Sequence, residues 1–411
     1  MRFRLFLSLL IIGIIAGLVG FALTELMHFI QHHAFAYALH GEELPFRIGA
    51  ENAAPLRRWA VLTLCGVLVG FGWYTIQRKG SKLIGFKAAM AKPQQGMPFF
   101  TTFCHALLQI ITVGLGSPLG RESAPREMSA AFASVWIKKV RLSDDDAALL
   151  IACAAGAGLA AVYNVPLAAA LFILETLVVA INTRVIFAAL LTAVTATMVV
   201  RYTLGDLVQY HLTETEINHA LLWFALLAGG LTTPIVKLFR RTTALFPFLA
   251  RDDKRIIPLA ILLFSLIGVA SIYFPDILGN GKAGNQLAFA GLLDWNDGLP
   301  LLLMKWLVVL FALAAGAYGG LITPSMMLGS ILAFSLALGW NMVLPPVSGE
   351  TAALIGATAF LAISLKMPLT AIVFALELTR SGSAMLLPLA LAVCSAWCVE
   401  KWLFDKPKTA R

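Results

Sequence analysis

Two glycine-rich breaks in long apolar stretches carry the residue types that could bind an anion. Gly114 to Pro125 reads G-L-G-S-P-L-G-R-E-S-A-P, and Gly316 to Pro324 reads G-A-Y-G-G-L-I-T-P. Glycines leave backbone amides exposed, and amides at the start of a helix carry partial positive charge along its axis. Two helix starts that converge would bind a halide-sized anion weakly enough to release it. Either break taken alone is explained equally well as a packing kink.

The first break holds one acid, Glu122. A carboxylate there competes with a bound anion for the same amide donors, and protonation removes its charge and frees the site. Glu122 is therefore an acid whose protonation could decide whether an anion occupies the break. The alternative is a salt bridge from Glu122 to Arg121 or Arg126 at the membrane face.

Two further acids, Glu175 and Glu377, lie in apolar stretches that repeat each other at an offset of 202 residues. The residues of the first stretch that recur in the second are Leu159, Ala160, Pro166, Leu167, Ala169, Phe172, Leu174 and Glu175, matched by Leu361, Ala362, Pro368, Leu369, Ala371, Phe374, Leu376 and Glu377. The chain is therefore predicted to consist of two related halves. An acid present in both halves favours a structural role, capping backbone or pairing with a neighbour such as Arg380, over a one-directional proton relay.

The composition places these breaks in a membrane. Hydrophobic residues make up 59% of the 411 residues and charged residues 13%, against roughly 45–50% and about 25% in soluble domains. Mainly apolar runs occur at 5–23, 59–73, 185–200, 256–272 and 301–317. Several are shorter than the ~17–25 residues of a simple span, which indicates tilted, re-entrant or discontinuous helices. We predict one transmembrane domain over 1–411, with a first repeat at about 1–205 and a second at about 215–405.

The formal net charge of +9 is concentrated in short segments that flank the apolar runs. The basic residues are Arg2, Arg4, Arg78, Lys79, Lys82, Lys87, Lys92, Lys401, Lys406, Lys408 and Arg411. The positive-inside rule then predicts a multi-pass protein of the cell inner membrane with both termini cytoplasmic, although Arg47, Arg57 and Arg58 run against it. Basic residues that flank spans do not indicate nucleic-acid binding.

The five cysteines lie in apolar stretches without the spacing of a disulfide framework, and we expect free buried thiols. They are Cys65, Cys104, Cys153, Cys394 and Cys398. Neither the Cys394–Cys398 pair nor Cys104 beside His105 completes a tetrahedral metal set, so no metal and no cofactor are predicted. Asp144 to Asp146, which follow Ser143, are expected to begin a helix capped by that serine.

Three stretches resemble the CLC family of chloride channels and proton/chloride antiporters. The stretch from Gly120 to Pro125 resembles the family's G-R-E-G-P, and Gly319 to Pro324 resembles its G-K/G-x-F-x-P. Tyr163 to Glu175 resembles F-N-A-P-L-A-G-x-L-F-x-x-E, with a matching stretch from Pro368 to Glu377. The resemblance implies an all-α membrane fold of two inverted repeats of tilted and broken transmembrane helices. It also implies a homodimer with one pore in each subunit, here without the cytoplasmic regulatory domain that some members carry.

Carried onto this chain, the resemblance makes Glu122 the gating glutamate and assigns the anion-binding positions. Ser81 stands 41 residues before Glu122, at the family's spacing for a serine ligand, although Lys82 occupies a usual glycine position and the family's proline is missing. Leu321 and Ile322 match positions that contact the anion through their backbone amides. The remaining predicted anion-binding residues are Gly120, Arg121, Ser123 and Gly320.

Two departures from the family pattern bear on function. No tyrosine follows Tyr318, so the family's central tyrosine is missing, and its nearest counterpart is the threonine of K-P-K-T at Lys406 to Thr409. Thr176 stands where many antiporters carry a proton-relay glutamate, and threonine cannot carry a proton at neutral pH. Thr323 in place of alanine is expected to change little.

These features predict a transporter for chloride or a similar small anion, coupled to protons as an H⁺/Cl⁻ antiporter. A passive, gated chloride channel is the alternative. A porter for organic solutes would need more polar mid-membrane residues, and an enzyme would need a nucleophile with a base or a metal set that the sequence does not offer. The expected partners are the anion, protons, membrane lipid and a second copy of the chain.

Overall fold

The computed structural model describes residues 3–37, 45–178, 180–212 and 217–404. Within these ranges the protein is built from helices, and the single pairing of extended backbone is an antiparallel bridge between Gly120 and Gly320. Lys406 to Thr409, the nearest counterpart of the missing tyrosine, lies outside the described residues.

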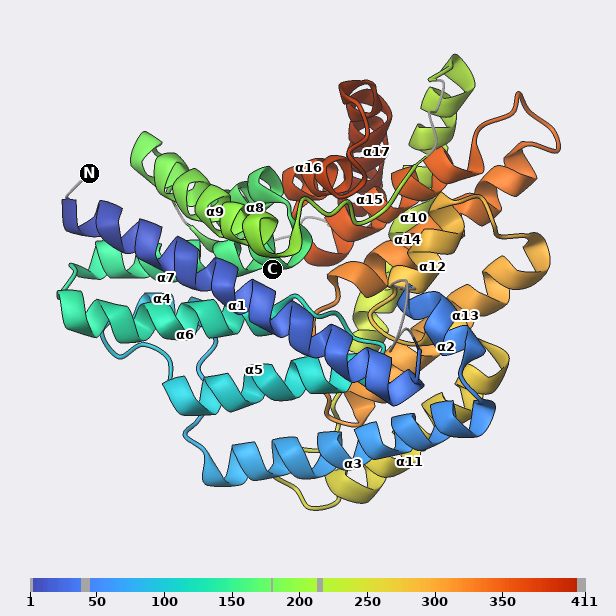
Figure 1. The fold of residues 1–411 in the computed structure, drawn as a ribbon. Coiled ribbons are helices and arrows are strands. Elements are labelled where there is room, and N and C mark those ends of the chain that lie inside the picture. The colour runs from blue at the N-terminus through green and yellow to red at the C-terminus, as the bar shows by residue number, and fades with distance from the viewer. Residues whose placement is uncertain (1–2, 38–44, 179, 213–216, 405–411) are drawn as a thin grey trace, which may run out of the picture.

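The order of long and short helices in the first half of the chain is repeated in the second half (Figure 1). The first half contains α1 (Phe3–Phe35), α2 (Phe46–Asn52), α3 (Pro55–Lys79), α4 (Phe86–Ala91), α5 (Phe99–Gly114), α6 (Ser123–Val140), α7 (Asp144–Tyr163), α8 (Pro166–Phe172) with a π-helical turn (Ile173–Leu177), and α9 (Thr183–Leu204). The second half contains α10 (His219–Thr243), α11 (Ile256–Tyr273), α12 (Lys282–Phe289), α13 (Trp295–Ala314), α14 (Ile322–Trp340), α15 (Gly349–Leu365), α16 (Pro368–Thr379) and α17 (Leu386–Phe404), with single 3₁₀ turns at Pro275–Ile277 and Ser383–Met385. Among the described helices, α2 alone has no counterpart.

Long and short apolar helices are mixed, as the apolar runs predict. Over the described residues nine helices are long and apolar enough to cross a membrane, among them α1, α7 and α14. The shorter apolar helices are α5, α15, α16 and the segment Pro166–Leu177. Short helices of this kind fit a membrane protein only where other protein surrounds their ends, because unpaired backbone groups are costly in lipid. The prediction of broken helices is therefore confirmed for this fold.

Equivalent caps fix the ends of equivalent helices in the two halves. The Ser143 hydroxyl accepts from the Asp146 amide at 3.4 Å to begin α7, as predicted, and the Ser348 hydroxyl accepts from the Thr351 amide at 3.4 Å to begin α15. At the other ends Asn164 (φ 60°) stops α7 and Lys366 (φ 56°) stops α15 in the left-handed region. Each is followed two residues later by the proline that begins the next short helix, α8 or α16.

Glu175 and Glu377 join the two halves by capping each other's short helix. The Glu377 carboxylate accepts from the Leu167 and Ala168 amides at the start of α8, at 3.0 and 2.8 Å. The Glu175 carboxylate accepts from the Leu369 and Thr370 amides at the start of α16, also at 3.0 and 2.8 Å. A carboxylate at a helix N-terminus accepts hydrogen bonds from free amides, and its negative charge is stabilised by the positive end of the helix dipole. The predicted capping role is therefore confirmed for both acids.

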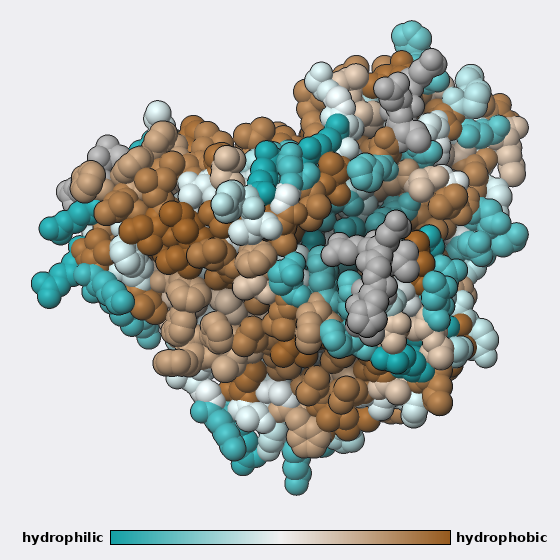
Figure 2. Space-filling model, in the orientation of Figure 1, coloured by the Kyte–Doolittle hydropathy of each residue, from teal (hydrophilic) through white to brown (hydrophobic). Residues whose placement is uncertain are grey.

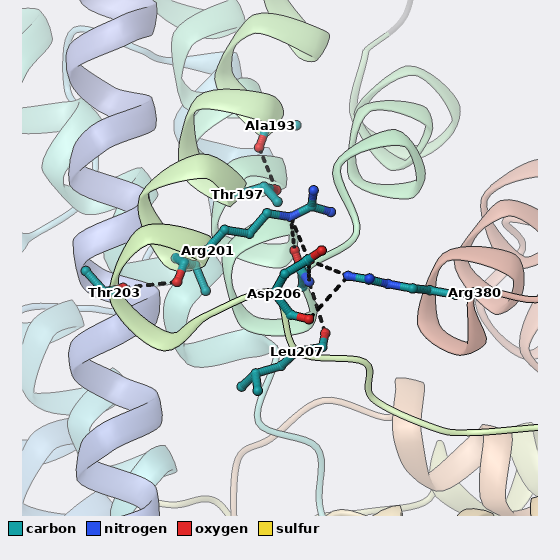
Figure 3. A network of polar contacts seen from close by, with 9 residues as sticks. Ala193, Thr197, Arg201, Thr203, Asp206, Leu207 and Arg380 are labelled. Carbon is teal, nitrogen blue, oxygen red and sulfur yellow. Dashed lines mark hydrogen bonds and ion pairs between the residues drawn. The ribbon is translucent and has the colours of Figure 1, made fainter.

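Arg380 pairs with a different acid from the one proposed. Its guanidinium contacts Asp206, which also forms an ion pair with Arg201 at 3.1 Å and accepts a hydrogen bond from the Asn164 side chain at 2.9 Å (Figure 3). Asp206 lies between α9 and α10, so this network links the end of α7, the end of α9 and the end of α16. These hydrogen bonds, from Asn164 first and Arg380 second, hold the pKa of the Asp206 carboxyl below its ordinary value.

Much of the surface is hydrophobic, with hydrophilic residues gathered at its ends and in a hollow (Figure 2). Cys65 and Cys153 are buried, but Cys104, Cys394 and Cys398 are exposed, so the prediction of buried thiols is wrong for these three. In a membrane protein an apolar residue gains little by facing protein rather than lipid, which explains why apolar context did not predict burial.

Candidate functional site

The two glycine-rich breaks meet, as predicted for a site made of helix starts. The Gly120 amide donates to the Gly320 carbonyl at 2.7 Å, and the Gly320 amide donates to the Gly120 carbonyl at 2.8 Å. The chain leaves α5 and α13 through Gly116 (φ 95°) and Gly316 (φ 81°), conformations that glycine adopts at little cost. The first residues of α6 and α14 are therefore held beside each other.

Glu122 precedes α6, and its carboxylate caps the helix of the other half. The side chain is fully buried, and its Oε1 accepts from the Ile322 amide in the first turn of α14 at 2.8 Å. Oε2 accepts from the Tyr163 hydroxyl at 2.9 Å. The carboxylate thus occupies a position at a helix N-terminus where a free anion would be stabilised.

The alternative of a salt bridge to a neighbouring arginine is wrong. Within the described part of the chain no ion pair joins Glu122 to Arg121 or Arg126. Arg121 donates to the Val162 carbonyl at 3.2 Å and lies over the Tyr163 ring. The Arg126 guanidinium stacks instead on the rings of Phe86 and Phe172.

Tyr163 and Thr323 belong to the site, and sequence reasoning missed both. Their hydroxyl oxygens are 2.6 Å apart. Since the single Tyr163 proton is directed to the Glu122 carboxylate, the Thr323 hydroxyl must donate to the Tyr163 oxygen, which gives a chain of two hydrogen bonds ending on the acid. The contact between Thr323 and Tyr163 was not foreseen when Thr323 was expected to change little. A phenol is present at the site although the family's late tyrosine is missing.

Two glycines leave the space that the carboxylate fills. A Cβ added at Gly320 would lie 1.8 Å from Glu122 Oε1, and one added at Gly120 would lie 2.2 Å from Oε2. Any side chain at either position would therefore displace the acid. Gly120 and Gly320, which were predicted as anion-site residues, therefore border the position of the Glu122 carboxylate.

The remaining predicted site residues divide between this cluster and other places. Ser123 begins α6 and Leu321 precedes α14, so both flank the cluster. Ser81 is exposed and lines a separate cavity of about 430 Å³, and the Thr176 hydroxyl donates to the Phe172 carbonyl at 2.7 Å. No contact between described residues joins Ser81 or Thr176 to Glu122.

Three cavities are lined by residues adjacent to the cluster. One of about 500 Å³ reaches Leu321 and is lined by basic residues of α10, including Arg240 and Arg241. Two others, of about 260 and 140 Å³, reach Arg121. Leu321 and Arg121 directly precede Ile322 and Glu122 in the chain, so each cavity reaches a residue next to the candidate site.

A multi-pass helical membrane protein in which a buried carboxylate from one half caps a helix start of the other half is suited to holding and exchanging an anion. The chain belongs to the voltage gated chloride channel family, whose model matches residues 63–401. The resemblance drawn from the three motifs is therefore confirmed.

Named relatives cover most of the chain. The H(+)/Cl(-) exchange transporter ClcA of Vibrio campbellii is 27% identical over 421 residues, which cover 97% of this chain and 86% of the relative. The putative chloride channel protein ClcB-like of Ralstonia nicotianae is 28% identical over 349 residues, covering 81% and 79%.

Solved structures share the fold. The structure of a slow cyanobacterial Cl⁻/H⁺ antiporter superimposes with a TM-score of 0.85 at 21% identity, covering 99% of this chain and 96% of that chain. A CLC-type fluoride/proton antiporter gives 0.66 at 21% identity, covering 97% and 95%. The predicted fold class, an all-helical protein of two inverted CLC-like repeats, is confirmed by these neighbours.

Proposed function

We propose that the protein is an H⁺/Cl⁻ antiporter in which Glu122 is gate and proton acceptor. The observation that carries this proposal is the Glu122 carboxylate on the Ile322 amide, because an acid that occupies an anion site can be exchanged for an anion when it is protonated. The relatives named as exchange transporters support coupling to protons.

In the proposed cycle, the ionised Glu122 side chain closes the site. Protonation removes the charge that the Ile322 amide and the Tyr163 hydroxyl stabilise, and the neutral side chain leaves. Chloride then takes the vacated donors, with Leu321 at the same helix start. Deprotonation returns the carboxylate and expels the anion, so each proton bound by Glu122 is linked to anion movement.

The other predicted anion-binding residues keep proposed roles according to their places. Gly120 and Gly320 leave room for the ion, Ser123 and Arg121 flank it on the side of the first half, and Ser81 acts at the mouth of its own cavity, away from Glu122. Thr176 stays a predicted position on the proton pathway.

We further propose a single transmembrane domain, with a first repeat at about 1–205 and a second at about 215–405. The protein is expected to form a homodimer in the inner membrane with both termini cytoplasmic, and to have no enzyme activity. A passive, gated chloride channel remains the second candidate, favoured by the Thr176 hydroxyl, which bonds within its own helix where a relay acid would be needed.

Chloride efflux from liposomes that contain only purified protein and salt tests the function. The external pH is recorded under a chloride gradient, with wild type beside Glu122→Gln. We expect chloride efflux to drive protons uphill in wild type, and Glu122→Gln to move chloride without protons because glutamine cannot be ionised. Glu127→Gln, five residues along the chain, is the matched control and should stay coupled.

The outcomes separate the candidates. Efflux without proton movement in wild type would make the protein a channel. The absence of flux for any small anion would refute transport while leaving the fold intact. Coupled efflux in Glu122→Gln would remove Glu122 from the proton pathway.

A further inference from the structure

A basic cavity opens beside the candidate gate, where the end of α1 meets α2 and α12 (Figure 1). It has a volume of about 260 Å³, and a smaller cavity of about 140 Å³ continues toward α9. Both are lined by His28, Arg121 and Lys282. Figure 2 shows hydrophilic side chains gathered in a hollow on the same face, between hydrophobic flanks.

Among the described residues, the side chains of these cavities that can carry charge at neutral pH are all bases, and Tyr37 adds a phenol to the larger cavity. The bases are His28, His32, Arg47, Arg121 and Lys282. Gln31, Asn280 and Gln286 add amide donors to the larger cavity. The acid beyond the smaller cavity, Asp206, is already held by Arg201 and Arg380 and so does not neutralise this lining (Figure 3).

Two of these bases keep donor groups without partners in the described structure. Arg121 is only 6% exposed, yet its Nε has no hydrogen-bond partner. The Lys282 ammonium makes neither a hydrogen bond nor an ion pair with any described residue. Lys305, by contrast, is fully buried and donates to the Ile277 and Gly279 carbonyls at 2.8 and 2.7 Å.

Burial of like charges around one cavity is unfavourable unless a counter-ion lies between them. Burial and the nearby Arg121 guanidinium lower the pKa of the Lys282 ammonium to about 8, so these surroundings destabilise its charge. Such a pair of bases is a site for an anion. The cavity exceeds the ~30 Å³ of one liquid water several-fold, so it can take a small anion with part of its hydration shell.

We propose that Arg121 and Lys282 bind a small inorganic anion in this cavity, forming a waiting site next to Glu122. The proposal rests on the transport function proposed above and adds a second anion position to it. Arg121 belongs to both positions because it directly precedes Glu122 and lines both cavities. An ion held there enters when the Glu122 side chain leaves.

The test measures chloride flux in proteoliposomes as a function of chloride concentration, for wild type, Lys282→Gln and Lys282→Arg. At pH 7 we expect Lys282→Gln to raise the apparent KM for chloride about three- to tenfold, with maximal flux within about twofold. Lys282→Arg should keep the wild-type KM. Lys87→Gln, an exposed lysine of α4 that lines neither cavity, is the matched control for loss of one positive charge.

A pH series adds a signature that a structural role of Lys282 would not give. As pH rises through about 8, Lys282 loses its proton, so the KM of wild type should approach that of Lys282→Gln by pH 9. Lys282→Arg should keep a low KM throughout, since arginine stays charged. The other bases around Lys282 are the same in wild type, Lys282→Gln and Lys282→Arg, so a difference between the three pH profiles reports on position 282.

Bromide soaked into crystals tests the site independently of transport. We expect an anomalous peak between Arg121 and Lys282 in wild type and none there in Lys282→Gln. An unchanged KM in Lys282→Gln, or no bromide at this place in wild type, would overturn the proposal. A wild-type protein that carries no anion would refute the transport function, and the bromide experiment would then decide the waiting site alone.

Discussion

Removal of the Tyr163 hydroxyl should change the pH at which the gate opens. Tyr163→Phe deletes the donor that lies 2.9 Å from Glu122 Oε2 and leaves the Ile322 amide on Oε1. The ring volume is nearly unchanged, so the packing against Phe374 should persist. The variant therefore isolates one hydrogen bond to the ionised acid.

The size of the effect follows from the charge on the acceptor. A hydrogen bond to a charged group contributes roughly 1.5–3 kcal/mol, and each pH unit corresponds to about 1.4 kcal/mol. Loss of the bond destabilises the ionised form of Glu122, so protonation releases the side chain at higher pH. We expect the half-maximal point of flux against pH to move upward by about 1–2 units.

The assay is proteoliposome chloride efflux from pH 4 to pH 9 at saturating chloride, so that a change in anion affinity does not enter. Tyr210→Phe is the matched control, because Tyr210 is also buried but its hydroxyl accepts from Asn285. Thr323→Val should move the profile in the same direction by less, since Thr323 acts through Tyr163. A Tyr163→Phe profile that superimposes on wild type would refute the proposed hydrogen-bond chain.

Two further predictions concern the glycines and the capping acids. Gly320→Ala places a Cβ where Glu122 Oε1 lies, so flux should lose its pH dependence, whereas Gly339→Ala, whose Cβ would meet atoms no closer than 3.5 Å, should keep it. A normal pH profile in Gly320→Ala would mean that the carboxylate does not rest there. Glu377→Gln presents an amide NH₂ to the two helix amides that the carboxylate caps, and we expect it to lower the free energy of unfolding by about 1–3 kcal/mol. The thermal unfolding midpoint in detergent should fall accordingly. The exposed Glu51→Gln is the control and should leave the midpoint unchanged. Equal midpoints in both variants would refute the capping argument.

The parts of the protein that depend on backbone chemistry were predictable from the sequence. Three sequence features each indicate how backbone amides are left free or capped. They are the glycine breaks before helices, the serine before three aspartates and the acid repeated in both halves, and the structure has each as expected. Helix starts bind through backbone amides that every residue except proline carries. The convergence of the breaks could therefore be inferred without knowing any side-chain contact.

The side-chain part of the site could not be predicted in the same way. Tyr163 and Thr323 are 160 positions apart, and nothing in the sequence brings their hydroxyls to within 2.6 Å. The available signal was a hydroxyl at the first position of a motif where the family carries phenylalanine. The basic cavity is lined by the end of α1, by α2 and by α12, which are distant from one another in the sequence. Only the fold therefore shows that Lys282 and Arg121 line the same cavity.

The geometry also explains why one acid can serve two halves of the chain. Glu122 comes from the first half, and its carboxylate is held by the Ile322 amide of the second half and by Tyr163 of the first. Its release therefore breaks one contact between the halves while the reciprocal Gly120–Gly320 hydrogen bonds stay in place. The proposed gating therefore needs the Glu122 side chain to break only its contacts to Ile322 and Tyr163, and the Gly120–Gly320 backbone pairing is not among them.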